Sequence, residues 1–291
     1  MLDTGLNQRV VLITGANNPY GIGAATARAF AAQGASVFLH YWRQPAPEQR
    51  ENPTTPGEAF YAAQQEQTPE RLIQEIRAGG GRAESWETDL SHPEVVPELL
   101  DRAEQALGQV DILVNNAAYW EADTFLPSHT ELQNRLVELW TSRSPTINAG
   151  ICDRMFAVNV RAAVLLMAEF ARRHIAGNRT WGRILNVSTD GAFCFPSEIT
   201  YGAGKYAMES YMRSAASELG RFGITVNTIS PGPIQTGWIT PELEKALLPS
   251  SPMSRMGQPQ DIADAMILLA SEQARWITGQ VVHVGGGHSM L

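Results

Sequence analysis

Short apolar runs that alternate with helical patterns are the feature of this 291-residue sequence that most constrains its fold. The expected strands, rich in β-branched residues, cover 10–14, 37–40, 82–86, 112–114, 183–187, 224–229 and 281–284. The expected helices, in which apolar residues recur three or four positions apart, cover 24–33, 69–78, 94–107, 155–174, 201–220 and 259–271. This alternation predicts βαβ units and therefore an α/β fold: a doubly wound (Rossmann) parallel sheet of about seven strands with helices on both faces.

Two stretches interrupt the alternation, and neither resembles a linker between domains. We therefore expect a single domain over 1–291 with insertions at about 44–68 and 122–150. The first insertion is rich in Pro, Gln and Glu and is expected to be partly disordered. The second contains Pro127, a short helical run over 132–140 and a cluster of helix-breaking residues. Such a loop acts as a lid or an oligomer contact in some proteins and is a solvent-exposed loop without a function in others. Both interpretations stay open.

The charge balance and the cysteines narrow the class of protein. A net charge of −8 and a pI of about 5.3 argue against the basic footprint that nucleic acids and anionic membranes require, so we expect neither as a partner. Cys152 and Cys194 offer neither a disulfide framework nor a metal cluster, and we interpret both as buried thiols in a reducing, cytoplasmic protein. The sequence shows neither a signal peptide nor an apolar run of about 18 residues.

A glycine-containing loop stands between the first expected strand and the first expected helix. Glycines allow the backbone to approach a ligand closely, and the free amides of a helix N-terminus attract a pyrophosphate. A plain tight turn would use similar residues, but the strand–loop–helix order favours dinucleotide binding. The candidate cofactor residues here are Gly15, Asn17, Tyr20, Gly21, Ile22 and Gly23.

The end of the second strand bears on the choice between NAD(H) and NADP(H). A carboxylate at this position bonds the ribose hydroxyls and repels a 2′-phosphate, whereas a cation attracts that phosphate. Here the strand ends His40-Tyr41-Trp42-Arg43, with no carboxylate, and Arg43 could pair with a phosphate. We therefore favour NADP(H) over NAD(H), with Tyr41, Trp42 and Arg43 at the site, although Arg43 could also be a solvated side chain.

Tyr201 and Lys205 lie four residues apart, which places a phenol and an ammonium on the same face of a helix. An ammonium that stabilises the phenolate would draw the tyrosine pKa down from about 10. Any helix can place these residue types four apart. However, the face continues with apolar residues as far as Leu219, so we expect the pair to point inward, where a buried lysine needs a partner.

Two further polar residues occupy positions where chemistry is plausible. Ser188 directly follows the strand over 183–187, at the sheet edge where ligands of open α/β sheets bind, although it could also cap a turn. Asn159 lies in an otherwise apolar helical stripe that includes Met155 and Phe170, so its amide should be buried and hydrogen bonded. Its periodicity alone favours a structural role.

Together these residues resemble the short-chain dehydrogenase/reductase family over nearly the whole chain. The elements similar to family motifs are the loop from Thr14, Asp89-Leu90, Asn115-Asn116-Ala117-Ala118, Asn159, Ser188, Tyr201 with Lys205, the segment Pro231-Gly232 with Ile234 and Thr236, and the final run from Val284. Ala118 and Gly285 stand where the family usually has glycine and aspartate. Five residues separate Gly15 from Gly21, whereas the common family loop has three. Because Asn18 precedes a proline, we expect the extra residues to project outward.

The resemblance implies reversible hydride transfer between NADP(H) and a ketone or secondary alcohol. By that resemblance Tyr201 donates the proton, Ser188 bonds the carbonyl oxygen, Lys205 tunes the tyrosine and holds the ribose, and Asn159 anchors a water. Asp89, Leu90, Asn116, Ala117, Ala118, Pro231, Gly232, Ile234 and Thr236 join the cofactor-binding residues. Lengthened loops occur in members that resemble 3-oxoacyl-[acyl-carrier-protein] reductases. Family members commonly form homotetramers or homodimers through the helices that carry Asn159 and Tyr201.

The substrate is a small carbonyl or alcohol whose identity the sequence leaves open. Trp120, Phe193 and Trp238, with Phe195 nearby, lie in segments that should border the site and suggest an apolar pocket. The segment 231–252, with a helical run over 242–248, could close over it. Two alternatives remain: an NAD-dependent secondary-alcohol dehydrogenase, and a non-catalytic nucleotide-binding sensor on the same fold.

Overall fold

In a computed structural model of the chain, residues 3–43, 53–127, 132, 135–139 and 144–288 are described. The strands are β1 (Val10–Thr14), β2 (Ser36–Tyr41), β3 (Ala83–Glu87), β4 (Ile112–Asn115), β5 (Gly182–Val187), β6 (Ile224–Pro231) and β7 (Val281–Val284). The α-helices are α1 (Ile22–Ala32), α2 (Glu58–Gln65), α3 (Glu70–Ala78), α4 (Val95–Leu107), α5 (Ala149–Phe156), α6 (Ala163–Ala176), α7 (Ile199–Leu219), α8 (Pro241–Leu247) and α9 (Pro259–Ala270). Every expected strand is present, within two residues at each end.

The seven strands form one parallel sheet in the order β3-β2-β1-β4-β5-β6-β7. The order reverses between β1 and β4, which is the switch point where the strand ends leave a crevice in doubly wound sheets. The predicted Rossmann-type fold is thus confirmed. The central strands β1, β4, β5 and β6 are buried along their whole length, as strands covered by helices on both faces must be.

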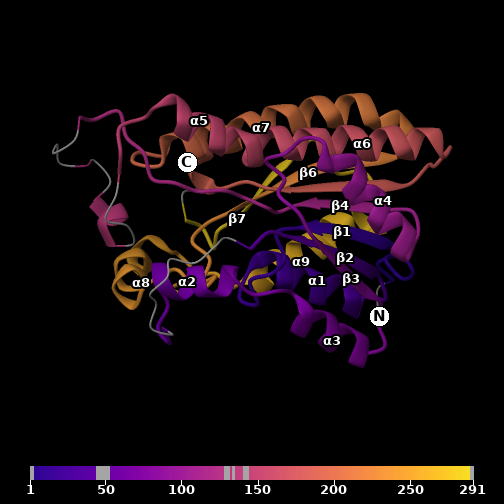
Figure 1. Cartoon of the computed structure of the whole chain (residues 1–291), viewed down its shortest axis with the longest axis horizontal. Coiled ribbons are helices and arrows are strands. Elements are labelled where there is room, and N and C mark those ends of the chain that lie inside the picture. Colours follow the sequence, from indigo (N-terminus) through magenta and orange to yellow (C-terminus); the bar gives the residue numbers. More distant parts are fainter. Residues whose placement is uncertain (1–2, 44–52, 128–131, 133–134, 140–143, 289–291) are drawn as a thin grey trace.

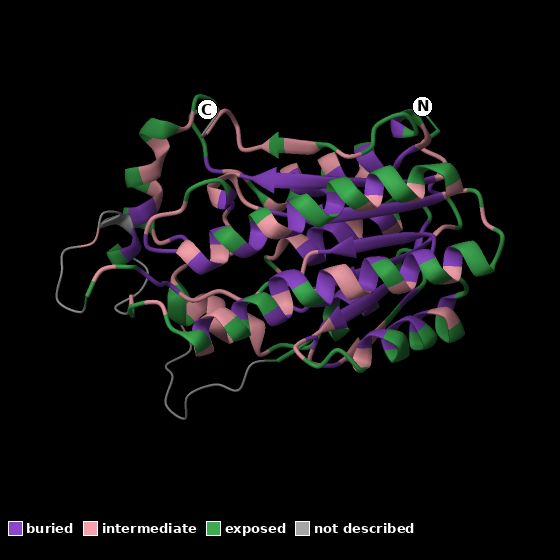
Figure 2. Cartoon of the chain, turned by 90° about the horizontal axis from the view of Figure 1, so that it is seen from above, coloured by how far each residue is buried: buried purple, intermediate pink, exposed green. Residues whose placement is uncertain are grey.

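Helices cover both faces of the sheet (Figure 1). One apolar layer joins α1, α3 and α9 to the sheet, with Phe30, Ile73 and Met266 among its buried side chains. The other joins α4, α6 and α7 to the opposite face, where Phe170 and Met212 are buried. Figure 2 shows the resulting pattern: the central strands are buried throughout, the edge strands β3 and β7 are only partly buried, and the helices are buried along the stripe that faces the sheet.

The long helix expected over 155–174 is interrupted by a π-helical segment, Ala157–Ala162, that joins α5 to α6. The stripe predicted for this helix is buried nonetheless. Its members are all 2% exposed or less: Met155, Asn159, Leu166 and Phe170. A π-helical turn widens the helix by one residue and is frequent at functional sites. Asn159 lies inside this segment.

The described part of the first insertion, 53–68, contains the helix α2, and residues 44–52 lie outside the described residues. Its helix α2 lies beside α8 (Figure 1), and Gly57 N donates to Gly237 O over 2.9 Å. In the second insertion, Thr124 N bonds Pro145 O, which folds the ends of the loop together. A short 3₁₀ helix, Arg135–Leu139, forms within the run expected over 132–140 and packs against α8, with Val137 fully buried.

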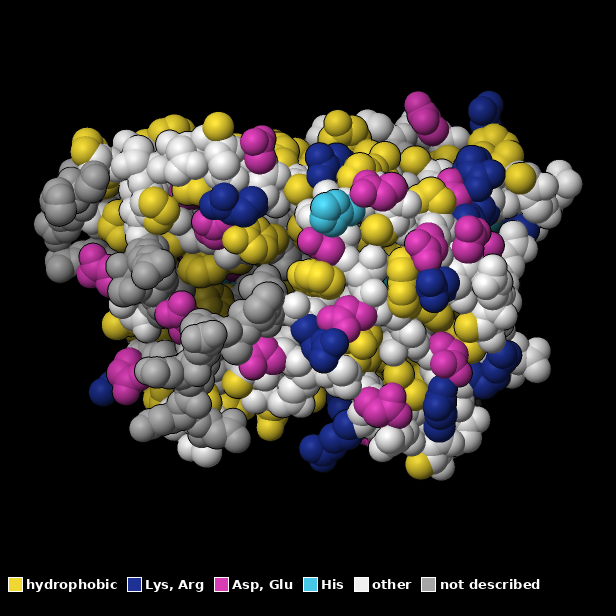
Figure 3. Space-filling model, in the orientation of Figure 1, with side chains coloured by type: hydrophobic (Ala, Val, Ile, Leu, Met, Phe, Trp, Pro, Cys, Tyr) yellow, Lys and Arg dark blue, Asp and Glu magenta, His cyan; other side chains and the backbone are white. Residues whose placement is uncertain are grey.

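The surface carries both signs of charge in a mixed pattern. Figure 3 shows Lys and Arg interspersed with Asp and Glu on the face that it draws. Within the described residues, no helix is long and apolar enough to span a membrane. The two cysteines are free thiols, but Cys194 is exposed and Cys152 half-buried, so the expectation of two buried thiols is wrong.

Candidate active site

The carboxyl ends of the parallel strands bring the predicted site residues together at one edge of the sheet. The glycine loop follows β1, Asn116 follows β4, Ser188 follows β5, and Gly232 follows β6. Tyr201 and Lys205 reach the same edge from the first turns of α7, which packs against β6. Residues separated by nearly two hundred positions thus become neighbours because all the strands run in one direction.

Side chains from β1, β2 and the segment after β4 hold the glycine loop in place. Thr14 Oγ1 accepts hydrogen bonds from the amides of Asn116 and Ala117, each at 3.0 Å. Asn116 Nδ2 in turn donates to the carbonyls of Thr14 and Gly15, each at 2.8 Å. At Gly15 the φ angle is +70°, and a Cβ would stand 2.8 Å from Ala117 Cα, so only glycine fits.

His40, at the end of β2, completes this support. Its Nδ1 accepts from Gly15 N at 3.3 Å and its Nε2 donates to Thr88 O at 2.8 Å, an arrangement that requires the neutral ring. Burial lowers the pKa of His40 to about 4, so the ring stays neutral at physiological pH. The sequence analysis treated His40 only as part of a strand.

The two extra residues of the loop do not project outward, contrary to expectation. Asn17 and Asn18 are 4% and 5% exposed, because both side chains bond to other segments. Asn17 Nδ2 donates to Gln65 O of α2 at 2.6 Å, and Asn18 Nδ2 donates to Thr236 O at 3.1 Å. The longer loop is therefore an anchor for both the insertion helix and the segment after β6.

The N-terminus of α1 fits a phosphate group. Gly21 occupies the N-cap position, no side chain caps the helix, and its first turn contains no acidic residue. The amides of Ile22 and Gly23 are therefore left for an anion, whose charge the helix dipole favours. Tyr20 lies at the mouth of this loop, 53% exposed, with its ring 5.4 Å from that of Phe60 on α2.

Arg43 is not a free cation, because Glu87 holds its guanidinium. Arg43 Nε and Nη2 donate to the two oxygens of Glu87 at 2.8 and 2.7 Å. The carboxylate comes from the end of β3, where Glu87 is in register with Tyr41. A carboxylate therefore does lie beside the end of β2, although it belongs to β3 and the end of β2 itself contains none. The pair lies at the protein surface beside Trp42, which is 44% exposed.

Lys205 is buried, with 3% of its surface exposed, and points toward the end of β5. Its ammonium donates to Val187 O at 2.8 Å and lies 5.7 Å from the centroid of the Tyr201 ring. Burial lowers the pKa of Lys205 to about 8. An ammonium has three protons, and among the described residues only Val187 accepts one, so two remain for a ligand such as a ribose.

Tyr201 is half-buried and lies next to acidic groups. Burial is the main cause of a pKa raised above the usual value of tyrosine, and the nearby charges of Glu198 and Asp190 raise it further. This direction is opposite to the lowering expected from the Tyr201–Lys205 spacing alone. The phenol is therefore fully protonated at neutral pH in the protein without ligands.

Asn159 clamps the backbone of the segment after β4. Its Oδ1 accepts from Tyr119 N at 2.9 Å, and its Nδ2 donates to Tyr119 O at 2.7 Å. The two bonds satisfy a side chain that is only 2% exposed. These two bonds give Asn159 the structural role that its helical periodicity favoured.

The Ser188 hydroxyl is turned along α7 rather than toward Tyr201. Ser188 Oγ donates to Glu209 Oε1 at 2.6 Å, and both residues are buried. Glu209 lies eight residues after Tyr201, which corresponds to about 12 Å along a helix. Ser188 would have to rotate its hydroxyl away from Glu209 to reach an oxygen beside Tyr201.

The aromatic residues expected around a substrate divide into two groups. The rings of Trp120 and Trp238 lie 5.8 Å apart, and the ring of Phe195 lies 6.4 Å from that of Tyr201. Phe193 is 85% exposed and packs edge-on against Tyr206 of α7, so it belongs to neither of these two ring contacts.

The remaining predicted cofactor residues all lie at this edge. Asp89 accepts from Ser91 N at 2.8 Å in the turn after β3, where Leu90 is buried in the core. After β4, Ala118 is exposed. Pro231 ends β6, Ile234 is 6% exposed, and Thr236 forms the contact with Asn18 noted above.

Sequence reasoning missed four side chains that shape the site: His40, Tyr61, Glu87 and Glu198. Tyr61, on α2, is close enough for its charge to raise the Tyr201 pKa, and Gln65 Nε2 donates to its hydroxyl at 2.6 Å. Only Glu198 carried a local signal, since it stands three residues before Tyr201. The others come from segments that only the folded chain brings to this edge.

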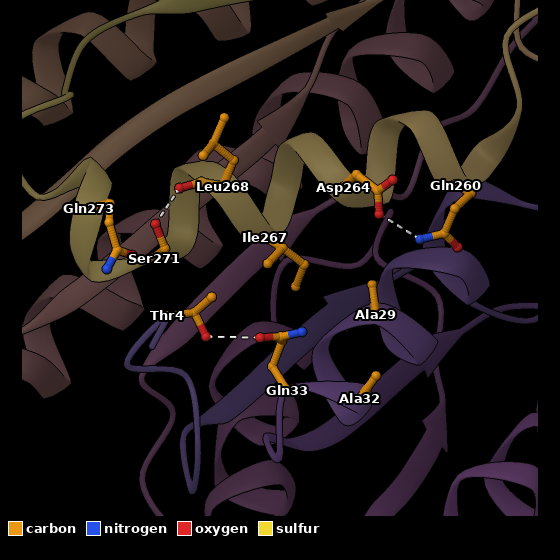
Figure 4. Close-up of a pocket in the computed structure, with 10 residues that line it drawn as sticks. All are labelled: Thr4, Ala29, Ala32, Gln33, Gln260, Asp264, Ile267, Leu268, Ser271 and Gln273. Atoms are coloured by element: carbon orange, nitrogen blue, oxygen red, sulfur yellow. Dashed lines mark hydrogen bonds between the residues drawn. The ribbon is translucent and has the colours of Figure 1, made fainter. Parts of the chain in front are cut away.

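Neither of the two cavities described below is lined by the predicted site residues. A cavity of about 380 Å³ lies between α1 and α9 and contains none of the predicted site residues (Figure 4). Its walls include Ala29, Ala32 and Ile267, and its polar groups are already paired, as in the bond from Thr4 Oγ1 to Gln33. A smaller cavity of about 170 Å³ lies between α1 and α3.

Comparison with known proteins agrees with the arrangement of the strands. The family model described as "Enoyl-(Acyl carrier protein) reductase" matches residues 54–289. The uncharacterized oxidoreductase YjdA of Bacillus subtilis (strain 168) is 34% identical over 281 residues, which cover 96% of each chain. A short-chain dehydrogenase/reductase from Serratia marcescens BCRC 10948 superposes with a TM-score of 0.77 at 25% identity, covering 98% of this chain and 99% of that one. A blue fluorescent protein from a metagenomic library, solved in complex with NADPH, gives a TM-score of 0.75 at 27% identity and the same coverage.

The chain therefore belongs to the short-chain dehydrogenase/reductase family. It is an oxidoreductase that acts on a carbonyl or alcohol and binds a nicotinamide nucleotide.

Proposed function

We propose that this protein is an NADP(H)-dependent reductase that interconverts a ketone and a secondary alcohol, with Tyr201 as the proton donor. The observation that carries the proposal is the placement of Tyr201 and Lys205 on one face of α7, at the carboxyl edge of the sheet. The buried ammonium lies 5.7 Å from the phenol ring. Beyond its bond to the Val187 carbonyl it has two protons for a ligand.

The residues present fit a dinucleotide. The uncapped N-terminus of α1 would hold the pyrophosphate, and Lys205 would hold the hydroxyls of the nicotinamide ribose. The segment from Pro231 to Thr236, which follows β6, would pack against the nicotinamide ring. When bound, the nicotinamide donates or accepts the hydride.

Tyr201 supplies the proton to the carbonyl oxygen in the direction of reduction. Its raised pKa keeps the phenol protonated until the oxygen becomes basic, so the proton is available across the neutral range. The Lys205 ammonium then stabilises the phenolate that remains. Ser188 would support the same oxygen after rotating away from Glu209, and Asn159 would keep the segment after β4 in place, with a water beside it connecting Lys205 to solvent.

An apolar carbonyl substrate is favoured over an acidic one. Trp120, Trp238 and Phe195 supply apolar surface, and the charged neighbours Glu198 and Asp190 would repel an anion. A 3-oxoacyl thioester is compatible with this pocket. The arginines that could have docked an acidic carrier protein are engaged: Arg172 and Arg173 both pair with Glu169, and Arg161 donates to Ser91 O.

NADP(H) is favoured because a related structure contains NADPH and because the Arg43 guanidinium, although paired with Glu87, lies beside the expected ribose. The same site supports a second candidate, an NAD-dependent secondary-alcohol dehydrogenase. Glu87 carries the observation that favours it, since a carboxylate at this edge bonds ribose hydroxyls and repels a 2′-phosphate. The affinities for NADPH and NADH, measured side by side, decide between the two.

Replacing Tyr201 with Phe tests the catalytic proposal and also separates an enzyme from a nucleotide-binding sensor. We expect the variant to lose turnover on a panel of small ketones, because no other group delivers the proton, while NADPH affinity stays within about threefold of the parent. Turnover is followed as NADPH oxidation and affinity by fluorescence titration. Retained turnover in the variant, or a parent that binds NADPH and reduces no ketone, would contradict the proposal.

We further propose a homodimer or homotetramer formed through the helices that carry Asn159 and Tyr201. Three large side chains on their outer faces are exposed: Phe156 on α5, and Tyr206 and Tyr211 on α7. Both cysteines are free thiols, which supports a cytoplasmic location.

A further inference from the structure

Glu198 is a buried carboxylate that the proposed mechanism does not use. It is 2% exposed and stands three residues before Tyr201, at the N-cap position of α7. Its Oε2 accepts from Trp120 Nε1 at 2.5 Å. Its Oε1 is also buried, and none of the described residues donates a hydrogen bond to it. Such an oxygen is costly unless something else pairs with it.

The fold does not need this carboxylate as a helix cap. Acidic residues at N-cap positions normally accept from the first amides of the helix, but the Glu198 side chain makes no such bond. Asp123 performs that function instead, because it accepts from Thr200 N at 3.0 Å. Glu198 is turned to Trp120, on the segment after β4 that borders the expected substrate position.

The surroundings of Glu198 are aromatic and acidic. The Trp120 ring lies 5.8 Å from that of Trp238, so a second indole packs against the one that bonds the carboxylate. Asp123 and Asp190 are the neighbouring charges, and Asp190 Oδ2 also bonds His288 Nδ1 at 2.6 Å. Burial together with these two charges raises the pKa of Glu198 to about 7. Among the described residues no Lys, Arg or His forms a salt bridge with it, and Lys205 donates to Val187 O.

We propose that Glu198, Trp120 and Trp238 form a subsite for a cationic amine on the carbonyl substrate. A buried carboxylate with a free acceptor oxygen pairs best with a charged N–H donor, and indole faces attract cations. A neutral hydroxyl could donate the hydrogen bond but would not offset the burial of the negative charge. This subsite rests on the proposed reductase function and defines its substrate class: ketones that carry an ammonium group.

Two ketones of similar shape and different charge test the subsite. Protonated N-methyl-4-piperidone and neutral 4-methylcyclohexanone are compared at neutral pH with NADPH, and kcat/KM is measured for each. We expect the cationic ketone to be preferred by at least about tenfold, the factor that corresponds to 1.4 kcal/mol. The ratio should fall at least about tenfold in Glu198→Gln, which keeps the shape and removes the charge. Glu218→Gln, an exposed position on the same helix, is the matched control and should leave the ratio unchanged.

Binding measured by calorimetry separates failure of the subsite from failure of the reductase proposal. If neither ketone is reduced, the reductase proposal fails, and the subsite is judged by titrating the chain with 4-hydroxy-N-methylpiperidine and with 4-methylcyclohexanol. Preferential binding of the amine that Glu198→Gln abolishes supports the subsite. Equal use of the two ketones by the parent, a ratio unchanged in Glu198→Gln, or calorimetry that finds no preference for the amine overturns it. A thermal melt of each variant confirms that it is folded.

Discussion

At the scale of single residues, the site shows how strongly burial competes with charge. The spacing of Tyr201 and Lys205 suggests that an ammonium should lower the phenol pKa. In the folded chain the desolvation of Tyr201 and the charge of Glu198 outweigh that effect, and the pKa rises. Lys205 is itself buried, which lowers its own pKa to about 8. Neighbours in sequence could not reveal this balance, because it depends on what packs over them.

The Arg43–Glu87 pair gives a prediction about cofactor choice. In Glu87→Gln the guanidinium loses its charged partner, and the carboxylate that repels a 2′-phosphate is gone. We expect the ratio of NADPH to NADH affinity to rise by about tenfold, and to fall in Arg43→Ala. Both dissociation constants are measured by fluorescence titration. Unchanged ratios in both variants would place the ribose elsewhere.

Glu198 makes stability depend on pH. Its pKa is about 7 in the folded chain and 4.5 in the reference state. Below about 4.5 both states are protonated and the group has no effect, but between about 4.5 and 7 the unfolded chain loses the proton first, so the free energy of unfolding falls as the pH rises. Above about pH 7 the decrease in the free energy of unfolding stays constant, at roughly 3 kcal/mol. Glu198→Gln should be more stable than the parent by roughly that amount at pH 8 and equally stable at pH 4, by urea denaturation. A constant difference across this range would contradict the assignment.

At the scale of elements, α2 is the part of the chain whose role the sequence concealed. Its polar composition indicates disorder, yet it is held at three places. Asn17 Nδ2 bonds Gln65 O at its end, Gly57 N bonds Gly237 O before its start, and the Phe60 ring packs against Tyr20. It therefore joins the glycine loop to the segment after β6, and it brings Tyr61 near Tyr201.

Phe60→Ala should loosen this attachment, since removing a half-buried ring costs roughly 1 to 3 kcal/mol. We expect faster amide exchange over 58–65 and a KM for NADPH raised severalfold, because the glycine loop loses a neighbour. Mass spectrometry of exchanged peptides and steady-state kinetics measure the two effects. The exposed Glu58→Ala on the same helix is the control. Exchange that is equally fast in the parent would show that α2 is not held.

At the scale of the whole molecule, both insertions fold onto one end of the sheet. The 3₁₀ helix Arg135–Leu139 packs against α8, and the chain that begins α2 bonds the segment that precedes α8. The described parts of the two insertions thus lie at the edge of the sheet where the site residues gather. Ordinary turns connect the elements at the opposite edge.

The exposed aromatic residues of α5 and α7 predict self-association. Light scattering should give a mass of two or four times 31.8 kDa, because this face leaves Phe156, Tyr206 and Tyr211 in solvent in the single chain. Replacing Phe156 and Tyr211 with Asp should shift the mass toward one chain. A monomeric parent at micromolar concentration, or an unchanged mass in the variant, would contradict this interface.

The sequence by itself determined the strands, the helices other than α2 and the residues that follow the strands, because these depend on local periodicity and on glycine and tyrosine–lysine spacings. From these patterns Tyr201, Lys205, Asn159 and the glycine loop could be placed at one sheet edge. Only the tertiary structure decided which groups meet there. Glu87 against Arg43, Glu209 against Ser188, and α2 against Asn17 are contacts between segments 20 or more residues apart. The physical reason is that pairing and desolvation depend on neighbours in space, and those neighbours exist only after the strands have aligned.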